Sequence, residues 1–500
     1  MKRLLKRIFL GALIFFAIFF AVFFILVALP VPAPLIPNKT LTPFAITNVS
    51  VIDIEAGSLI PGQTVVIEKG QITNVGPTAS IIMPENAIQI DATGKFLIPG
   101  LWDMHAHLGT KMSPQLTLPL FIAGGVTNIR ELGGVSLDYK RGIHQKILSG
   151  ALIGPRLMGY ASAFVASLDS RDQAVELVTD LIDSKPGFIK VYNQLLPEYY
   201  FSLIEEAKKQ GITVLGHKPR AVSAIDGANA GHKSFEHARL FLFECYPGAS
   251  QLRERYRARY SGEVSMGGRI IQTSDRREMI DNHSPDLFDE LATVMVENGT
   301  WFVPTHITRK MDAFADNEAY RQDARLSYIQ VLQRYKWNSD ADGMIEQDPS
   351  PEGRKAFMDF YLKGLELTGK AHRAGVKILA GTDANDTYCF PGLGIHDELQ
   401  ELVKAGLTPI EALKTATLNP AEYFGVSADY GSIASGKVAD LMLLDANPLE
   451  NISNTAKIDK VIFNGNVYTR KELDNMLAYV AGNASSLSIS CKLIWQEISE

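Results

Sequence analysis

Two histidines separated by one residue are the first side chains in this sequence whose spacing indicates chemistry. His105 and His107 lie in PGLWDMHAHLG, where a short apolar run predicts a strand. Positions i and i+2 of a strand point to the same side, so both imidazoles can face one metal ion. A lone pair of this kind is more often an ordinary pair of core residues. A metal site therefore requires further ligands elsewhere in the chain.

Further metal-binding side chains end other predicted strands. His217 ends ITVLGH, His237 ends KSFEH, and Asp383 ends VKILAGTD. A barrel of parallel strands places its catalytic residues at these strand ends. Imidazole and carboxylate ligands together suit Zn²⁺, Mn²⁺, Fe²⁺ or Co²⁺, with one coordination position left for water. The sequence therefore predicts a divalent-metal site.

A lysine ends another apolar strand. Lys190 lies in GFIKVY, at a position where lysine is seldom buried. It either reaches solvent at the strand end or is buried near cations, which favours the neutral amine. A neutral amine can take up CO2 and become a carbamate, whose two oxygens can bridge metal ions about 3.5–4 Å apart. The pattern alone leaves both interpretations open.

The elements that must position these residues repeat along the middle of the chain. Between residues 99 and 425, β-rich runs alternate with amphipathic stretches such as RDQAVELVTDLID and YYFSLIEEAKKQG. Many repeated βα units predict an α/β fold, a closed (β/α)8 TIM barrel. An open doubly wound sheet is the alternative, but no G-x-G-x-x-G opens a helix after a first strand. Late in this region, Thr408, Pro409 and Glu411 predict a helix start with a capping box.

Other segments flank or interrupt the predicted barrel. Residues 44–98 and 426–470 alternate apolar and polar residues and break at glycines, which predicts a small β-sandwich domain formed from N- and C-terminal segments. Residues 471–500 form a C-terminal extension. Two long excursions, residues 246–298 and 308–370, either cover the carboxyl-end face of the barrel as a lid or are solvated helical insertions.

The N-terminus has a composition of its own. Residues 1–7 form a tail with four basic side chains: Lys2, Arg3, Lys6 and Arg7. Residues 8–29 carry no charge and are long enough to cross ~30 Å of hydrocarbon as one transmembrane helix. The basic tail would stay in the cytoplasm, and the catalytic domain would lie on the extracytoplasmic side, beyond a Pro-rich linker at residues 30–43. A cleaved signal peptide, which would leave a secreted or periplasmic enzyme, is the alternative, although its apolar region is typically only about 7–15 residues.

Composition excludes several classes of protein. The formal net charge is −6, which gives no basic surface typical of nucleic-acid binding. The three cysteines, Cys245, Cys389 and Cys491, are odd in number and far apart, so they indicate neither a disulfide framework nor a cysteine-rich metal site. We therefore expect no nucleic-acid partner, while the oligomeric state stays open.

The ordered segments resemble one enzyme superfamily. PGLWDMHAHLG, FIKVY, VLGH, FEHA, AGTDA and GLTPIEALKTATLNPAEYFG are similar, in this order, to the amidohydrolase superfamily. Within it, the chain most resembles the group of imidazolonepropionase-like and metal-dependent Xaa-Pro dipeptidase-like proteins, over about residues 44 to 470. The resemblance implies a hydrolase of C–N bonds in a small amide, cyclic amide or peptide-like substrate.

The resemblance also implies roles for individual residues. The implied metal ligands are His105, His107, Lys190, His217, His237 and Asp383. The first two histidines and the aspartate would hold one ion, the other two histidines a second ion, and carboxylated Lys190 would bridge them. Both ions are expected to be Zn²⁺, with Mn²⁺, Fe²⁺ or Co²⁺ as alternatives. Asp383 would accept the proton of a metal-activated water and pass it to the leaving nitrogen.

The contacts to substrate are less clearly indicated. The segment MGYASAFVASL lacks the histidine that dipeptidase-like members often carry there, which leaves a dipeptide substrate in doubt. Three side chains are candidate substrate contacts: Tyr192, His306 and His396. The first lies on the same strand face as Lys190, the second ends the predicted strand TWFVPTH, and the third follows Asp383 closely in sequence.

Other interpretations keep the barrel and change its use. One is a mononuclear deaminase-type member with an unmodified lysine, and another is an esterase- or lactonase-type member. A third is a non-enzymatic, tethered binding protein. We also expect Arg130 and Glu131, at the end of TNIREL, to form a buried ion pair under the site.

Overall fold

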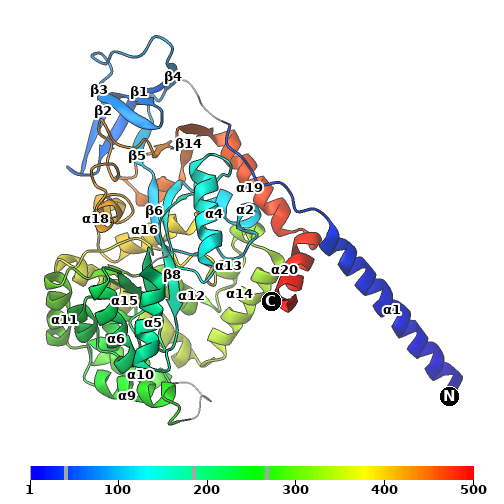
Figure 1. Ribbon diagram of the computed structural model, residues 1–500. Coiled ribbons are helices and arrows are strands. Elements are labelled where there is room, and N and C mark those ends of the chain that lie inside the picture. The colour runs from blue at the N-terminus through cyan, green and yellow to red at the C-terminus, as the bar shows by residue number, and fades with distance from the viewer. Residues whose placement is uncertain (1, 39–42, 183–186, 265–269, 500) are drawn as a thin grey trace.

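The computed structural model describes residues 2–38, 43–182, 187–264 and 270–499 (Figure 1). The last part of the predicted linker, the last residue of RDQAVELVTDLID and part of the first long excursion therefore lie outside the described residues. Helix α1, Lys2–Ala28, extends away from the rest of the chain. Its stretch Arg3–Ala28 is apolar and long enough to cross a membrane, and none of its most apolar part is buried in the protein.

One mixed sheet joins the two ends of the chain. Its strands are β1 Phe44–Asp53, β2 Ser58–Glu68, β3 Gln71–Pro77, β4 Ile88–Asp91, β5 Phe96–Pro99, β13 Leu441–Leu444, β14 Ile458–Phe463 and β15 Asn466–Thr469. The strand order is β15-β14-β13-β5-β1-β2-β3, with β4 paired to β1, and the two ends meet where Met442 of β13 pairs with Ile98 of β5. The strands thus form one hydrogen-bonded sheet and not the predicted β-sandwich, because the β13–β5 pairing joins both terminal segments edge to edge.

The middle of the chain forms a nearly closed parallel barrel. Its seven strands are β6 Leu101–Ala106, β7 Val126–Glu131, β8 Arg156–Val165, β9 Phe188–Val191, β10 Val214–Gly216, β11 Ser234–Glu236 and β12 Trp301–Val303. VKILAGTD, predicted to be the last strand, makes only an isolated bridge, from Ile378 to Phe302 of β12, and Ala384, the residue after it, bridges Ala106 of β6. It nevertheless fills the gap between the first and last strands. Trp102, Met104 and Val303 pack together inside the barrel.

Helices cover the outside of the barrel and join its strands. They are α2 Ser113–Leu116, α3 Leu118–Ala123, α4 Leu137–Leu148, α5 Arg171–Ile182, α6 Pro197–Lys209, α7 Ala224–Ala230, α8 Leu240–Glu244, α11 Pro285–Glu297, α16 Gly394–Lys404, α17 Pro409–Thr415 and α18 Leu418–Tyr423. Helix α6 shows why they pack, since Tyr200, Leu203 and Ala207 recur at helical spacing and are all buried. The predicted capping box at the start of α17 is present, with Thr408 and Glu411 bonded reciprocally.

The long excursions and the C-terminus are also helical. The excursions contain α9 Ala249–Tyr260, α10 Thr273–Asp281, α12 His306–Phe314, α13 Glu318–Arg321, η1 Ala324–Tyr328, α14 Val331–Ile345 and α15 Pro351–Arg373. After β13 the chain adds η2 Ile452–Ala456, α19 Arg470–Ala484 and α20 Leu487–Ser499. Helix α20 lies against the end of α1, where the rings of Trp495 and Phe24 are 5.4 Å apart and Ser488 Oγ donates to the carbonyl of Leu26.

Candidate active site

The two histidines of the first barrel strand converge on one aspartate. His105 lies in β6 and is wholly buried, while His107 follows the strand and is partly exposed. Asp383 Oδ1 lies 3.1 Å from His105 Nε2 and 2.9 Å from His107 Nε2. Burial alone would raise the pKa of Asp383, but these two histidines outweigh it and hold that pKa well below its ordinary value. An ionised carboxylate and two imidazoles therefore share one small volume.

A second pair of histidines adjoins this group. His217 follows β10, His237 follows β11, and their Nε2 atoms lie 2.8 Å apart. Burial, together with nearby positive charge, holds the pKa of both rings well below its ordinary value, so both are neutral imidazoles, the form that binds metals. His237 Nδ1 lies 3.7 Å from Asp383 Oδ2, which joins the two groups into one cluster.

Lys190 points into the same cluster from the neighbouring strand β9. Its side chain is buried, and its Nζ lies 3.4 Å from His105 Nε2. Burial lowers the pKa of Lys190 from its ordinary value, although Asp383 and Glu236 oppose this shift. The interpretation in which Lys190 reaches solvent at the strand end is therefore wrong, and the neutral amine is favoured.

The backbone is strained at three residues of the cluster and its border. His237, Thr305 and Asp383 have positive φ angles of 77°, 44° and 60°. Residues with a Cβ atom seldom adopt this conformation, which costs about 1–3 kcal/mol each. Thr305 Oγ1 lies 2.8 Å from His237 Nδ1, so one strained residue orients another. Strain concentrated in this way is typical of a functional site.

The donor set fits a divalent cation. Ligand atoms of His105, His237 and Asp383 all lie within 4.8 Å of one another. The paired Nε2 atoms of His217 and His237 can share only one proton, and His217 Nδ1 is buried without a hydrogen-bond partner among the described residues. Imidazoles and one carboxylate that face the same space are a typical ligand set for Zn²⁺ and related ions.

Buried residues behind the cluster support it in ways the sequence did not reveal. Glu236 Oε2 accepts a hydrogen bond from His105 Nδ1 at 2.9 Å, and Glu236 Oε1 pairs with Arg130 at 2.8 Å. Asp103 accepts from the backbone N–H groups of His105 and Thr382, which ties β6 to the closing segment. Glu236 directly precedes one predicted ligand and Asp103 lies two residues before another. Proximity to the predicted ligands was therefore the signal available in the sequence.

The expected ion pair between Arg130 and Glu131 is wrong. Arg130 pairs with Glu236 inside the barrel, and Glu131 Oε2 pairs instead with Lys140 Nζ at 2.8 Å. Neighbouring residues of a strand point to opposite faces, so these two side chains diverge. Both charges are buried and compensated, Arg130 by a carboxylate distant in sequence and Glu131 by a lysine on the following helix α4.

Tyr192 lies where a substrate contact was expected. Its ring meets the ring of His217 edge-on, with centroids 4.2 Å apart, and lies 5.0 Å from the ring of Phe164. The side chain is partly exposed beside the cluster. Its role as a substrate contact stays a prediction.

The other two candidate substrate contacts lie elsewhere in the fold. His306 is wholly buried, with Nε2 3.0 Å from Thr368 Oγ1. His396 lies 2.9 Å from Thr455 Oγ1 through Nδ1 and 3.0 Å from the carbonyl of Gly124 through Nε2. Burial and these hydrogen bonds hold both rings inside the fold, and their role as substrate contacts stays a prediction.

A comparison with known protein families shows to which family the chain belongs. A family model described as "Amidohydrolase family" matches residues 96–468. The chain belongs to the amidohydrolase family. This confirms the predicted superfamily and the predicted class of enzyme.

Several amidohydrolase-like proteins are similar over most of this chain. An adenine deaminase from Moorella thermoacetica is 21% identical over 83% of this chain and 56% of its own length, so the chain spans little more than half of that relative. An ochratoxinase from Aspergillus niger is 24% identical over 80% of this chain and 82% of its own length. A crystal structure of a Xaa-Pro dipeptidase shares the fold, with a TM-score of 0.60 and 20% identity over 85% of this chain and 100% of that chain.

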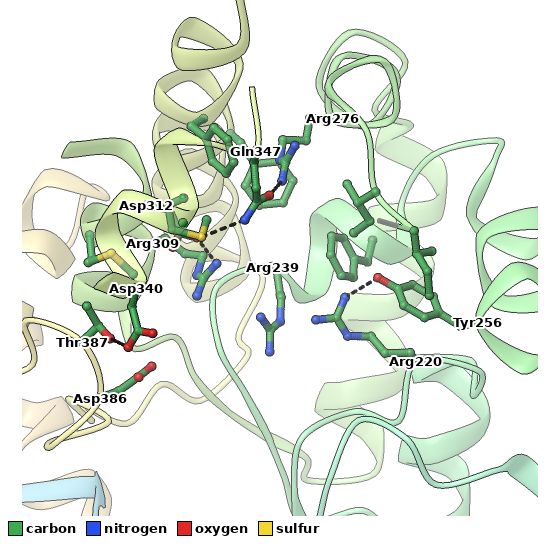
Figure 2. Close-up of a pocket in the computed structure, with 18 of the residues that line it drawn as sticks. Arg220, Arg239, Tyr256, Arg276, Arg309, Asp312, Asp340, Gln347, Asp386 and Thr387 are labelled. Atoms are coloured by element: carbon green, nitrogen blue, oxygen red, sulfur yellow. Dashed lines mark hydrogen bonds and ion pairs between the residues drawn. The ribbon is translucent and has the colours of Figure 1, made fainter. Parts of the chain in front are cut away.

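A cavity of about 900 Å³ lies beside the cluster in this amidohydrolase barrel (Figure 2). Asp386, which lines it, follows Asp383 by three residues. Both long excursions contribute to its wall, the first through Tyr256 and the second through Asp312 and Asp340. The excursions therefore lie near the cluster, at the carboxyl-end face of the barrel, where a lid was one of the two expectations.

Replacing Glu236 with glutamine is expected to weaken metal binding about 10–100-fold, because His105 loses the carboxylate that fixes its orientation. The same variant leaves Arg130 buried without its anion, which is expected to lower the free energy of unfolding by about 3–5 kcal/mol. Metal titration and urea unfolding of the full chain in detergent measure the two effects. Asp440→Asn is the control, since it breaks the buried pair with Arg156 outside the cluster and should lower stability alone. Unchanged metal affinity in Glu236→Gln would refute the orienting role.

Proposed function

We propose that the chain is a metal-dependent hydrolase of C–N bonds in a small amide, cyclic amide or peptide-like substrate. One observation carries this proposal: side chains from separate strand ends converge on one buried cluster. The converging residues are His105, His107, Lys190, His217, His237 and Asp383. Family membership supports the proposal, and so does the presence of a deaminase and a dipeptidase among similar proteins.

The same six residues would hold two divalent ions, with Zn²⁺ expected. Lys190 would bridge the ions after its neutral amine bonds to the carbon of CO2 and loses a proton, which gives a carbamate. The buried position of its Nζ, 3.4 Å from His105 Nε2, supports this modification. When bound, the ions would supply an acidified water and polarise the scissile carbonyl.

The protein's own groups would move and hold the protons. Asp383 is ionised and faces the histidines, so it would take the proton of the attacking water and pass it to the leaving nitrogen. Glu236 would keep a proton on His105 Nδ1 and leave Nε2 free as a ligand. Tyr192, at the edge of the cluster, would contact the bound substrate.

A mononuclear deaminase-type enzyme is the second candidate. Only His105, His237 and Asp383, among the described residues, form a group whose ligand atoms lie within 4.8 Å of one another, which suits a single ion. In that case Lys190 would stay an unmodified amine.

We also propose that α1 anchors the enzyme in a membrane, with the catalytic domain on the extracytoplasmic side. The basic residues at the start of α1 and its uncharged length support this topology. Contacts of α20 with Phe24 and Leu26 support retention of the helix, because a cleaved signal sequence would leave that face of α20 without its partner.

Metal analysis of the full chain, purified from membranes in detergent, tests the proposed function. We expect about two ions per chain, and hydrolysis of N-acyl amino acids, dipeptides or lactams that stops on chelation and returns with the metal. One ion and release of ammonia from an aminated heterocycle would support the second candidate instead. Hydrolysis of esters or lactones alone, or a chain without metal and activity, would contradict both.

The same preparation tests the anchor. The full chain should sediment with membranes after an alkaline wash, and its N-terminal sequence should include α1. A mature chain beginning near residue 30 would contradict the anchor while leaving the hydrolase proposal intact.

A further inference from the structure

The cavity beside the cluster has an unusual charge distribution. Five arginines line it: Arg220, Arg239, Arg259, Arg276 and Arg309. Three carboxylates also line it: Asp312, Asp340 and Asp386. Arg309 is paired with Asp312, while Asp340 and Asp386 lie on the side opposite Arg220 in Figure 2. The cavity therefore has one acidic and one basic side.

The basic side adjoins the cluster. A smaller cavity lined by His217 also includes Arg220, Arg239 and Phe243, and these three residues line the large cavity as well. In sequence, Arg239 follows the proposed ligand His237 by two residues. A substrate whose scissile bond lies at the cluster can therefore extend one end towards these arginines.

Arg239 carries a positive charge that the described protein does not neutralise. No hydrogen bond or ion pair joins its guanidinium to any residue in the part of the chain that the structure describes, and Figure 2 shows it in the middle of the cavity. Arg220 and Arg309 line the same cavity and add further positive charge to it. Arginine stays charged in proteins, so a bound anion would offset the free-energy cost of leaving the Arg239 charge without a partner.

Arg220 is fixed in position but also lacks an acidic partner. Its Nη1 donates to Tyr256 Oη at 2.9 Å and its Nε donates to Asn193 Oδ1 at 3.2 Å, and both partners are neutral. Its guanidinium lies 4.7 Å from the ring centre of Phe243. Stacking on aromatic rings orients the flat guanidinium in advance, which suits planar recognition of carboxylate or phosphoryl oxygens.

Two uncompensated guanidinium groups call for two negative charges. We infer that the basic side of the cavity binds a doubly negative group of the substrate, one phosphoryl group or two carboxylates, held by Arg239 and Arg220. This inference rests on the proposed function, because it concerns the substrate of the same site. A single carboxylate neutralises only one of the two arginines. Hydrogen bonds to ionised groups of this kind are roughly twice as strong as neutral ones.

Calorimetric titration of the full chain in detergent, after metal removal by chelation, tests the inference. The probes are inorganic phosphate, glutarate and acetate at low ionic strength, where screening is weak. We expect phosphate or glutarate to bind at least about tenfold more tightly than acetate, a difference of about 1.4 kcal/mol. Preference for phosphate identifies a phosphoryl group, and preference for glutarate identifies paired carboxylates. The inference is overturned if acetate binds as tightly as phosphate and glutarate, or if none of the three probes binds.

Arg239→Gln should weaken the binding of the preferred probe about 10–100-fold. Arg257→Gln is the matched control, since Arg257 lies on α9, is half-exposed and pairs with Glu198 outside the cavity. Without a probe, Arg239→Gln should keep or raise the melting temperature, because it removes a cation that faces Arg220 and Arg309. A lowered melting temperature with unchanged probe binding would assign Arg239 a structural role and overturn the inference.

These measurements separate the inference from the proposed function. The probes bind to the metal-free chain, so their binding requires no hydrolysis. If the proposed function fails, the chain lacks metal and hydrolysis while the probes still distinguish Arg239→Gln from the parent. If the inference fails, metal content and hydrolysis persist while the probes show no preference.

Discussion

Lys190→Ala is expected to retain at most one metal ion per chain and to lose at least about a thousandfold in kcat/KM, since bridging two ions contributes several kcal/mol to catalysis. Lys190 Nζ lies deep in the cluster, 3.4 Å from His105 Nε2. Removing it leaves a small buried space where the carbamate would lie. Metal analysis by mass spectrometry and steady-state kinetics on the best amide substrate measure the two effects.

Short carboxylic acids supply a direct check on the carbamate. Propionate should partly restore the second ion and the activity of Lys190→Ala, because its carboxylate can occupy the space that the side chain leaves. Lys233→Ala is the control, since Lys233 precedes β11 at the end of the barrel opposite His237. A Lys190→Ala chain with two ions and parental kcat/KM would refute the bridging role. One ion in both the parent and the variant would favour the mononuclear candidate.

Asp383→Asn is expected to lower kcat by about 10²–10⁴-fold, with a smaller change in KM. Asparagine keeps an oxygen that can face the metal but cannot accept the proton of the attacking water. The parent side chain is ionised at neutral pH, because His105 and His107 hold the pKa of Asp383 well below its ordinary value. Kinetics with metal content measured on the same sample separate loss of proton transfer from loss of metal.

The control for this variant is Asp397→Asn, which removes a carboxylate on α16 that pairs with Arg325 outside the cluster. Its kcat should match that of the parent. A kcat of Asp383→Asn within tenfold of the parent, at full metal content, would show that another group accepts the proton.

The predicted ligands illustrate how far local sequence reaches. Each came from a residue type at the end of a β-rich run, and parallel strands bring such ends to one face of a barrel. The structure brings all six together, including Asp383, although its segment makes only isolated bridges. That segment was still predictable in position, because the order of the elements placed it after β12.

Side chains whose partners lie far away in the chain were less predictable. His306 and His396 follow strand-like or site-adjacent residues, yet Thr368 and Thr455 bind them inside the fold. The arginines of the cavity show the same limit, because they come from separate loops and helices whose packing no local pattern reveals. Their shared function therefore appears only in three dimensions.

The sequence by itself determined the apolar N-terminal helix, the parallel barrel, the identity of the candidate ligands and the family. The first three follow from periodicity and from residue type at strand ends, which are local properties, whereas the family follows from the resemblance of the ordered motifs. Only the tertiary structure decided that Lys190 is buried, that Arg130 pairs with Glu236 and not with Glu131, and that Arg239 faces a cavity without a neutralising partner. The physical reason is that burial and charge compensation depend on which distant segments pack together, and many packings are compatible with the same local pattern.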